Sequence, residues 1–174
     1  MKIINNLKIT DTAYGGYGVG RDSGGQVIFV YGAVEGDICS VELTDTRKNF
    51  AYGRVVEIIK PSPFRIRPAC SRANKCGGCS FAHIDYESQI NIKCKIIKNA
   101  FRKVPDIPEI LVHKSPSLNY RIRAAVKAKS GAIGFSGFKS NEFVSVKNCP
   151  VVKESLFVKI KVMCDNYYNN VIMV

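Results

Sequence analysis

The chain has 174 residues, of which 46% are hydrophobic, and its 26 Lys and Arg outnumber its 14 Asp and Glu, for a net charge of +12. This length allows one good core or two small domains, and the absence of any apolar run near the roughly 20 residues that a bilayer-spanning helix needs argues against a membrane protein. The excess positive charge indicates a polyanionic partner such as nucleic acid. Most of it lies in residues 68–174, with 17 basic and 7 acidic side chains, against 9 and 7 in residues 1–67.

Residues 1–62 are predicted to form a mainly β domain, an OB-like five-stranded antiparallel barrel. Short segments rich in Val, Ile, Phe and Tyr are separated by Gly, Asp and Asn, which is typical of strands joined by turns. These segments lie near residues 3–9, 20–21, 26–30, 38–43 and 52–59. The glycines of residues 15–20 lack the spacing and the following helix of a dinucleotide-binding loop, so we expect them to permit bends and close backbone approach in the barrel. Pro61 and Pro63 end the last strand and mark the domain boundary.

Cations and aromatic residues lie close together in this first domain. OB-like surfaces use that combination to hold phosphates and unpaired bases. The RNA-binding candidates are therefore Arg21, Lys48, Phe50, Tyr52 and Arg54. Because only one parity of a strand faces solvent, a core position is the alternative for Phe50 or Tyr52.

Residues 63–84 form a cysteine-rich loop in which three cysteines are spaced as C-x5-C-x2-C. They are Cys70, Cys76 and Cys79, and Cys149 stands far downstream before a proline. Thiolates are soft ligands that select an iron–sulfur cluster or zinc. The three-plus-one arrangement, the Gly-Gly pair between two ligands and the Cys-Pro pair favour a 4Fe–4S cluster. Zinc, usually held by two close cysteine pairs, is the alternative, followed by buried or disulfide-bonded cysteines.

The number of cysteines and the first residues of the chain indicate the cellular compartment. Seven cysteines are an odd number, and the first residues lack the long apolar core of a secretion signal. We therefore expect a cytoplasmic protein with reduced cysteines, acting as a monomer. Cys39, Cys94 and Cys164 fit strand-core or helix positions and are left out of the site.

Residues 85–104 are predicted to form a linking helix that Asp85 caps and that ends before Pro105. Its apolar positions recur in steps of four, four, three and four, so we expect this stripe to be buried and a basic face to be exposed. The stripe consists of Tyr86, Ile90, Cys94, Ile97 and Phe101.

Residues 105–174 are predicted to begin a second small antiparallel β region with an RNA-binding surface. In residues 120–129 the basic side chains share one parity, which places them on one sheet face suited to phosphate. These are Arg121, Arg123, Lys127 and Lys129. Residues 134–135 and 143–146 are expected to be partner strands, the latter leading to Cys149, and an amphipathic helix is expected from Val152.

Several of these segments resemble one known family. Residues 13–30 look like the opening of a TRAM domain, and residues 70–93 resemble the cluster motif of the TRAM-containing RNA uridine C5-methyltransferases. The matching positions are Cys76-Gly77-Gly78-Cys79, His83, Tyr86, Gln89 and Lys93, followed in family order by Tyr120-Arg121-x-Arg123-Ala124, Gly134-Phe135 and Cys149-Pro150-Val151. The resemblance implies a relative of the enzymes that methylate uridine in 23S ribosomal RNA, with a structural 4Fe–4S cluster and an S-adenosylmethionine domain that carries a nucleophilic cysteine and a glutamate base.

The chain is expected to depart from this family by lacking the S-adenosylmethionine domain. It would then be the N-terminal, RNA-binding and cluster portion, inactive alone, with no catalytic residue, and it would use S-adenosylmethionine only as part of a full-length protein. The alternatives are a stand-alone RNA-binding protein with a structural four-cysteine metal site, a fragment of a transfer RNA uridine methyltransferase, and an iron–sulfur electron carrier, which would leave the cationic and aromatic barrel without a role.

Overall fold

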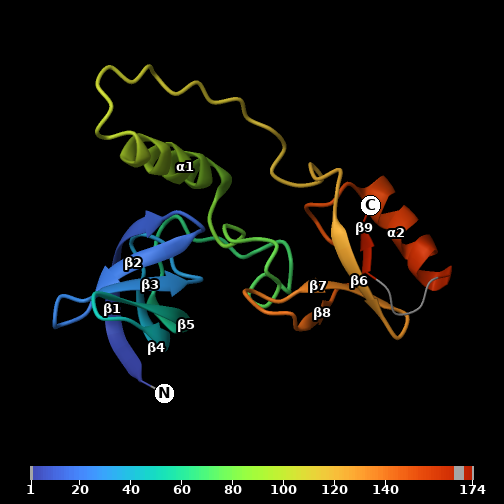
Figure 1. Cartoon of the computed structure of the whole chain (residues 1–174), viewed down its shortest axis with the longest axis horizontal. Helices are drawn as coiled ribbons and strands as arrows, with labels where there is room; N and C mark the ends of the chain where they lie inside the picture. Colours follow the sequence, from blue (N-terminus) through green and yellow to red (C-terminus); the bar gives the residue numbers. More distant parts are fainter. Residues whose placement is uncertain (1, 167–170, 174) are drawn as a thin grey trace. The chain divides into compact units, whose positions relative to one another are not determined.

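The computed structural model describes residues 2–166 and 171–173. It divides into two compact units (Figure 1). Unit 1 comprises residues 1–67 and 80–112, and unit 2 comprises residues 68–79 and 113–174. The cysteine-bearing segment 68–79 therefore belongs to unit 2, although it interrupts unit 1 in the sequence.

Unit 1 contains a closed five-stranded barrel, as the sequence predicts. Its strands are β1 (Ile3–Ala13), β2 (Tyr17–Arg21), β3 (Val27–Tyr31), β4 (Ile38–Thr46) and β5 (Phe50–Lys60), in the spatial order β1-β2-β3-β5-β4. The pair β3–β5 is parallel, whereas the other pairs are antiparallel, so the expectation of an entirely antiparallel barrel is wrong at this pair. The reason is that β4 intervenes in the sequence and returns the chain, so β5 can run beside β3 in the same direction.

The barrel interior is built by buried residues from all five strands, which alternate with outward-facing ones most regularly in β2 and β3. Ile28 and Val30 of β3 are completely buried, and they meet buried side chains from β1, β4 and β5. Gly53 of β5 faces the same interior. A Cβ atom at this position would lie 2.5 Å from Cγ1 of Val41 and 2.8 Å from the carbonyl oxygen of Glu42. The absence of a side chain therefore lets β4 and β5 approach closely.

A buried carboxylate joins the barrel to the segment that follows it. Asp37 is fully buried and accepts hydrogen bonds of 2.9 Å from the backbone N–H groups of both Val34 and Ser62. The guanidinium of Arg65 donates two more. Burial alone raises the pKa of Asp37, but these hydrogen bonds and the charge of Arg65 outweigh it and hold the pKa below its usual value.

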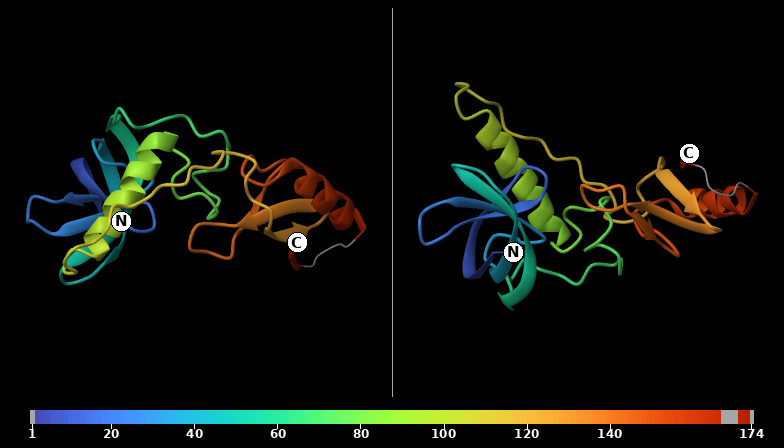
Figure 2. Two further views of the ribbon diagram at one scale, coloured as in Figure 1. Left: turned by 90° about the horizontal axis from the view of Figure 1, so that it is seen from above. Right: turned by 60° about the horizontal axis from the view of Figure 1, so that its bottom comes forward.

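Helix α1 (Tyr86–Ala100) begins as the sequence predicts. Asp85 is its N-cap and accepts a hydrogen bond of 2.9 Å from the backbone N–H of Ser88. The helix ends at Ala100, four residues before the predicted end at residue 104. Figure 2 shows the helix beside the barrel of unit 1.

The predicted buried stripe of α1 is right only in part, because Tyr86, Ile90 and Cys94 are half-buried but the last two positions are exposed. Ile92 is buried and, with Ile96, packs against Val34 and Ile84, whereas Ile97 and Phe101 are 43% and 50% exposed. Two apolar stripes compete on this helix, and the surrounding residues select the second. An ion pair network supports the choice, since the Nζ of Lys95 lies 2.8 Å from a carboxylate oxygen of Asp11 and 3.2 Å from one of Glu35.

Unit 2 contains the second small antiparallel sheet that the sequence predicts. Its strands are β6 (Ala125–Lys129), β7 (Ala132–Ser136), β8 (Phe143–Ser145) and β9 (Val171–Met173), in the order β8-β7-β6-β9. Helix α2 (Glu154–Asn166) contributes Phe157 and Ile160 to a core shared with Val126 and Ile133 of the sheet. Across the described ranges, no helix is long and apolar enough to cross a membrane.

Candidate functional site

The four cysteines singled out in the sequence meet in unit 2. Cys70, Cys76 and Cys79 lie on the loop of residues 68–79, and Cys149 follows β8. They are near enough that the charges of Cys70 and Cys149 act on the thiols of both Cys76 and Cys79. The fold therefore brings the distant fourth cysteine to the loop. No disulfide joins any of the seven cysteines, all of which lie among the described residues.

The hairpin of β7 and β8 fixes the position of the loop. The backbone N–H of Gly77 donates to the carbonyl oxygen of Ser136 at 3.0 Å, and that of Phe138 donates to Lys75 at 3.0 Å. Gly77 lies so close to this hairpin that a Cβ atom would be 2.9 Å from the carbonyl oxygen of Gly137. A side chain at position 77 would therefore push the loop away from the hairpin.

The electrostatics of the cysteines favour a cationic ligand. Burial raises the pKa of the Cys76 and Cys79 thiols, and the negative charges of the neighbouring cysteines raise it further. A hydrogen bond from the backbone N–H of Gly78 to Cys76 and the positive charge of Arg121 act in the opposite direction. Gathered thiolates thus repel one another, and a bound metal would remove this repulsion. By contrast, burial raises the pKa of Cys39 to about 11, which makes that thiol inert.

In the part of the chain that the structure describes, no group of three or more His, Cys, Asp or Glu is arranged to hold a metal ion. The argument for a metal therefore comes from the chemistry of the donor set, because four thiolates suit either zinc or an iron–sulfur cluster.

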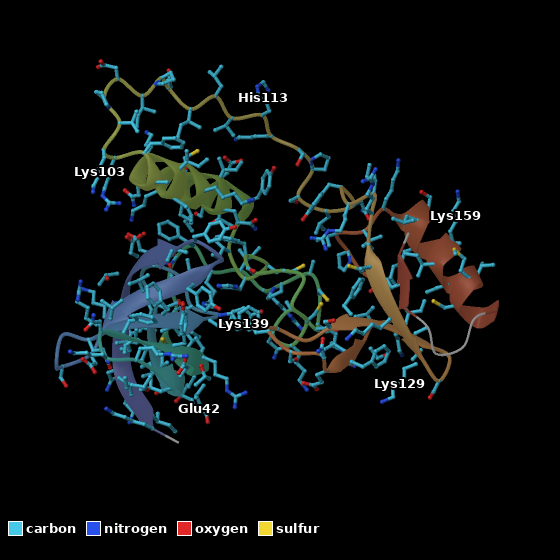
Figure 3. All side chains as sticks on the ribbon, viewed as in Figure 1. Glu42, Lys103, His113, Lys129, Lys139 and Lys159 are labelled. Atoms are coloured by element: carbon cyan, nitrogen blue, oxygen red, sulfur yellow. The ribbon has the colours of Figure 1, made fainter. Side chains whose placement is uncertain are left out.

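The four cations predicted to share one sheet face do not do so. Strand β6 begins at Ala125, so Arg121 and Arg123 lie in the segment before it, and only Lys127 and Lys129 share the strand. Lys129 is exposed at the end of β6, where Figure 3 labels it. The Nζ of Lys127 donates to the backbone oxygen of Asn141 at 3.1 Å. Pairing of the Arg121 backbone with residues 151–153 keeps this segment out of the sheet.

An aromatic face covers the outer side of β2, β3 and β5. Five half-buried aromatic rings lie there with centroid distances of 5.5 to 6.5 Å between neighbours. We define the aromatic face by these residues, which are Tyr17, Phe29, Tyr31, Phe50 and Tyr52. Phe50 and Tyr52 thus lie outside the barrel, and the alternative of a core position is wrong for both. The other three were missed, although their alternation with Gly18, Ile28 and Val30 could have identified them.

The predicted barrel cations flank this face. Arg21 lies at one end of the face, where it pairs with Val27, and Val27 pairs in turn with Phe50. Arg54 lies at the other end, where it pairs with Tyr31. Lys48 is exposed in the connection between β4 and β5. The charge of Arg54 is partly offset, because its Nε lies 2.6 Å from a carboxylate oxygen of Glu42, which Figure 3 labels on the barrel.

His83, which the family motif includes, has a structural environment. Its imidazole forms a hydrogen bond with the backbone of Ala33, while the Nε2 atom is buried without a hydrogen-bond partner. Burial lowers its pKa to about 4, and the nearby charge of Arg65 acts in the same direction. The ring is therefore neutral near pH 7. His113 is exposed and is labelled in Figure 3.

Comparisons with known proteins identify the relatives of the chain. The TRAM domain family matches residues 5–56. The chain is 37% identical over 155 residues to an uncharacterized RNA methyltransferase of Nostoc sp., covering 83% of this chain and 33% of that protein. It is 32% identical over 170 residues to the 23S rRNA (uracil(1939)-C(5))-methyltransferase RlmD of Photorhabdus laumondii, covering 89% of this chain and 38% of that protein. The chain thus spans about a third of the length of these relatives.

A solved structure shares the fold. The Pyrococcus abyssi tRNA (uracil-54, C5)-methyltransferase, in complex with S-adenosyl-L-homocysteine, superimposes with a TM-score of 0.62 at 22% identity, covering 90% of this chain and 35% of that one. Together with the curated relatives, this likeness extends from the barrel into unit 2. The chain therefore carries a TRAM domain and is homologous, over most of its length, to RNA methyltransferases that include the 23S rRNA uracil-C5 enzyme RlmD.

Proposed function

We propose that this chain is the RNA-binding and iron–sulfur portion of an S-adenosylmethionine-dependent 23S rRNA (uracil-5-)-methyltransferase. Its homology to relatives named RlmD supports ribosomal RNA over transfer RNA as the substrate. Because the chain spans about a third of such relatives, we assign methyl transfer and S-adenosylmethionine binding to the remainder, and no catalytic residue to this part. We expect no methyl transfer from it alone. We further propose a cytoplasmic location, in keeping with an RNA partner, and a monomer.

The observation that carries the RNA-binding proposal is the aromatic face. Aromatic rings on an OB-like barrel stack on unpaired bases, and each stacked base contributes about 1–3 kcal/mol. The ring face of Tyr52 or Phe29 suits any base, while Arg21 and Arg54 at the ends of the face can contact phosphates. Single-stranded RNA is the ligand that this arrangement fits, since the bases of a duplex present no free ring faces.

The charge of unit 2 supports binding to the RNA backbone. Residues 68–79 and 113–174 contain twelve Lys and Arg but only three Asp and Glu. Arg123, Lys127 and Lys129 are among these cations, and Arg123 and Lys129 are exposed. Contacts between cations and phosphates release counterions, so the affinity of this unit for RNA should fall steeply with salt.

The donor set supports the cluster proposal. Cys70, Cys76, Cys79 and Cys149 are buried or half-buried and lie near enough to one another to interact electrostatically. Soft thiolates in that number fit a 4Fe–4S cluster, which we propose to be structural. It would crosslink the loop 68–79 to the segment after β8 and so contribute to the stability of a unit with a small core.

The RNA-binding proposal is tested with a matched pair of variants in unit 1. We would measure fluorescence anisotropy of a labelled 12-nucleotide single-stranded RNA and of an RNA duplex with wild type, Tyr52→Leu and Phe101→Leu. Phe101 is an exposed ring beyond the end of α1, so its replacement controls for the loss of an aromatic residue. Tyr52→Leu should weaken single-strand binding roughly 5- to 150-fold, and Phe101→Leu should change it less than twofold. Equal affinities of the two variants, or a preference for duplex, would contradict the aromatic face as the binding surface.

The cluster proposal is tested by chemical analysis of anaerobically purified protein. We expect about four irons and four sulfides per chain. Cys149→Ser should lower both, whereas Cys94→Ser, at a cysteine on α1 outside the proposed site, should leave them unchanged. Stoichiometric zinc without sulfide would show that the site is a zinc site instead.

A further inference from the structure

Arg121 is fixed beside the fourth cysteine by its backbone. Its N–H donates to the carbonyl oxygen of Val151 at 2.8 Å, and its own carbonyl oxygen accepts from the N–H of Lys153 at 2.9 Å. Two residues earlier, the N–H of Asn119 donates to the carbonyl oxygen of Pro150 at 2.9 Å. Residues 119–121 therefore run along the segment that begins at the Cys149-Pro150 pair, and the position of Arg121 follows from this pairing.

The side chain of Arg121 reaches the cysteine loop. Its Nη2 donates to the carbonyl oxygen of Gly78 at 3.4 Å. Gly78 separates Cys76 from Cys79, and its own N–H is directed to Cys76. The half-buried Arg121 thus reaches the turn between two proposed ligands. One residue contacts the loop through its side chain and the Cys149 segment through its backbone.

We propose that Arg121 is a positioning residue of the four-cysteine site, one that ties the loop 68–79 to the segment after Cys149, rather than a contact to RNA phosphate. This rests on the proposed metal site and adds to it a role for a residue that is not a ligand. Hydrogen bonds around a metal site hold its ligands in place, and their loss weakens metal binding. Arg supplies a permanent charge and a planar donor group that can hold a carbonyl oxygen.

Arg123 provides the matched control. It is the same residue type, lies two positions further along the same segment and is exposed. If Arg121 acted merely as one more surface cation, loss of either arginine would have the same effect on the cysteines. The proposal therefore predicts that replacing Arg121, but not Arg123, affects the four-cysteine site.

The first experiment measures how firmly the protein retains its metal. We would purify wild type, Arg121→Gln, Arg121→Lys and Arg123→Gln anaerobically, determine iron, zinc and sulfide per chain, and follow their loss in air. Arg121→Gln should lose the metal severalfold faster than wild type, because the loop 68–79 loses its tie to the Cys149 segment. Arg121→Lys keeps a hydrogen-bond donor and should retain more metal than Arg121→Gln, and Arg123→Gln should match wild type.

The second experiment measures the RNA affinity of the same variants by fluorescence anisotropy, and Arg121→Gln should not weaken binding more than Arg123→Gln does. Equal metal retention in Arg121→Gln and Arg123→Gln overturns the role of Arg121, whatever metal is present. A larger loss of RNA affinity in Arg121→Gln than in Arg123→Gln, with unchanged metal retention, also overturns it in favour of a phosphate contact. Failure of the cluster proposal appears separately, as wild type without iron and sulfide.

Discussion

The buried imidazole of His83 should make unit 1 less stable in mild acid. Burial holds the pKa of the folded protein at about 4, against a usual value of 6.5. The unfolded chain therefore takes up the proton first as the pH falls. The stabilisation that the neutral ring provides is fully present above pH 6.5 and is lost progressively as the pH falls from 6.5 to 4.

The size of this effect follows from the two pKa values. At pH 5 the unfolded imidazole is protonated about thirtyfold over its neutral form, whereas the folded one remains mostly neutral. The free energy of unfolding should then be lower by RT ln 30, about 2 kcal/mol, than at pH 7.5. Below pH 4 the loss should level off at about 3 kcal/mol.

Two measurements check this expectation. With only two histidines in the chain, an NMR titration of the ring C–H signals should assign a midpoint near pH 4 to His83. Urea unfolding at pH 7.5 and 5.0 can be followed by tyrosine fluorescence, since the chain has no Trp and the barrel has three partly buried tyrosines. His83→Gln should remove most of the difference between the two pH values, and His113→Gln, at an exposed site, should keep it.

The reasoning would be refuted by a folded-state midpoint for His83 near 6.5. It would equally be refuted if His83→Gln lost as much stability between pH 7.5 and 5.0 as wild type does. Either result would mean that water reaches the ring in the folded protein, or that a hydrogen-bond acceptor beside the ring stabilises its protonated form.

Two further predictions concern the buried carboxylate and the cysteine loop. Asp37→Asn should lower the free energy of unfolding at pH 7.5 by about 3 kcal/mol, because it leaves the largely buried Arg65 without its counter-charge. Urea titration measures this change. A change below about 1 kcal/mol would show that water replaces the carboxylate. Gly77→Ala should reduce iron and sulfide content severalfold, because its Cβ would lie 2.9 Å from a carbonyl oxygen and push the loop away from the β7–β8 hairpin. Gly78→Ala should retain the cluster, since the nearest atom to its Cβ would be 3.6 Å away. Equal iron and sulfide contents in the two variants would contradict this.

The barrel could be predicted because short strands such as β2 and β3 alternate between core and surface. Ile28 and Val30 alternate with Phe29 in a short segment between turns, and that period of two indicates a strand with one buried face. The N-cap of α1 was predictable for a similar reason, since Asp85 precedes an apolar pattern of helical period. In both cases the signal is local.

The incorrect predictions concern residues whose burial or backbone pairing depends on segments distant in the sequence. The stripe of α1 that becomes buried depends on which side meets Val34 and Ile84, and the helix sequence by itself offers two candidates. Likewise, the parity of Arg121 in the sequence suggested a sheet face, but its backbone pairs with residues 151–153 instead. The convergence of Cys149 with the loop is untested as a metal site and remains a proposal.

The assignment of segment 68–79 to unit 2 has a consequence for the covalent connections of the chain. A single proteolytic cut between residues 112 and 113 would not release unit 2 as a separate piece. It would leave Cys70, Cys76 and Cys79 on one fragment and Cys149 on the other. Within unit 2, the two fragments of the nicked chain would then be joined by non-covalent contacts and by any metal that the four sulfur atoms share.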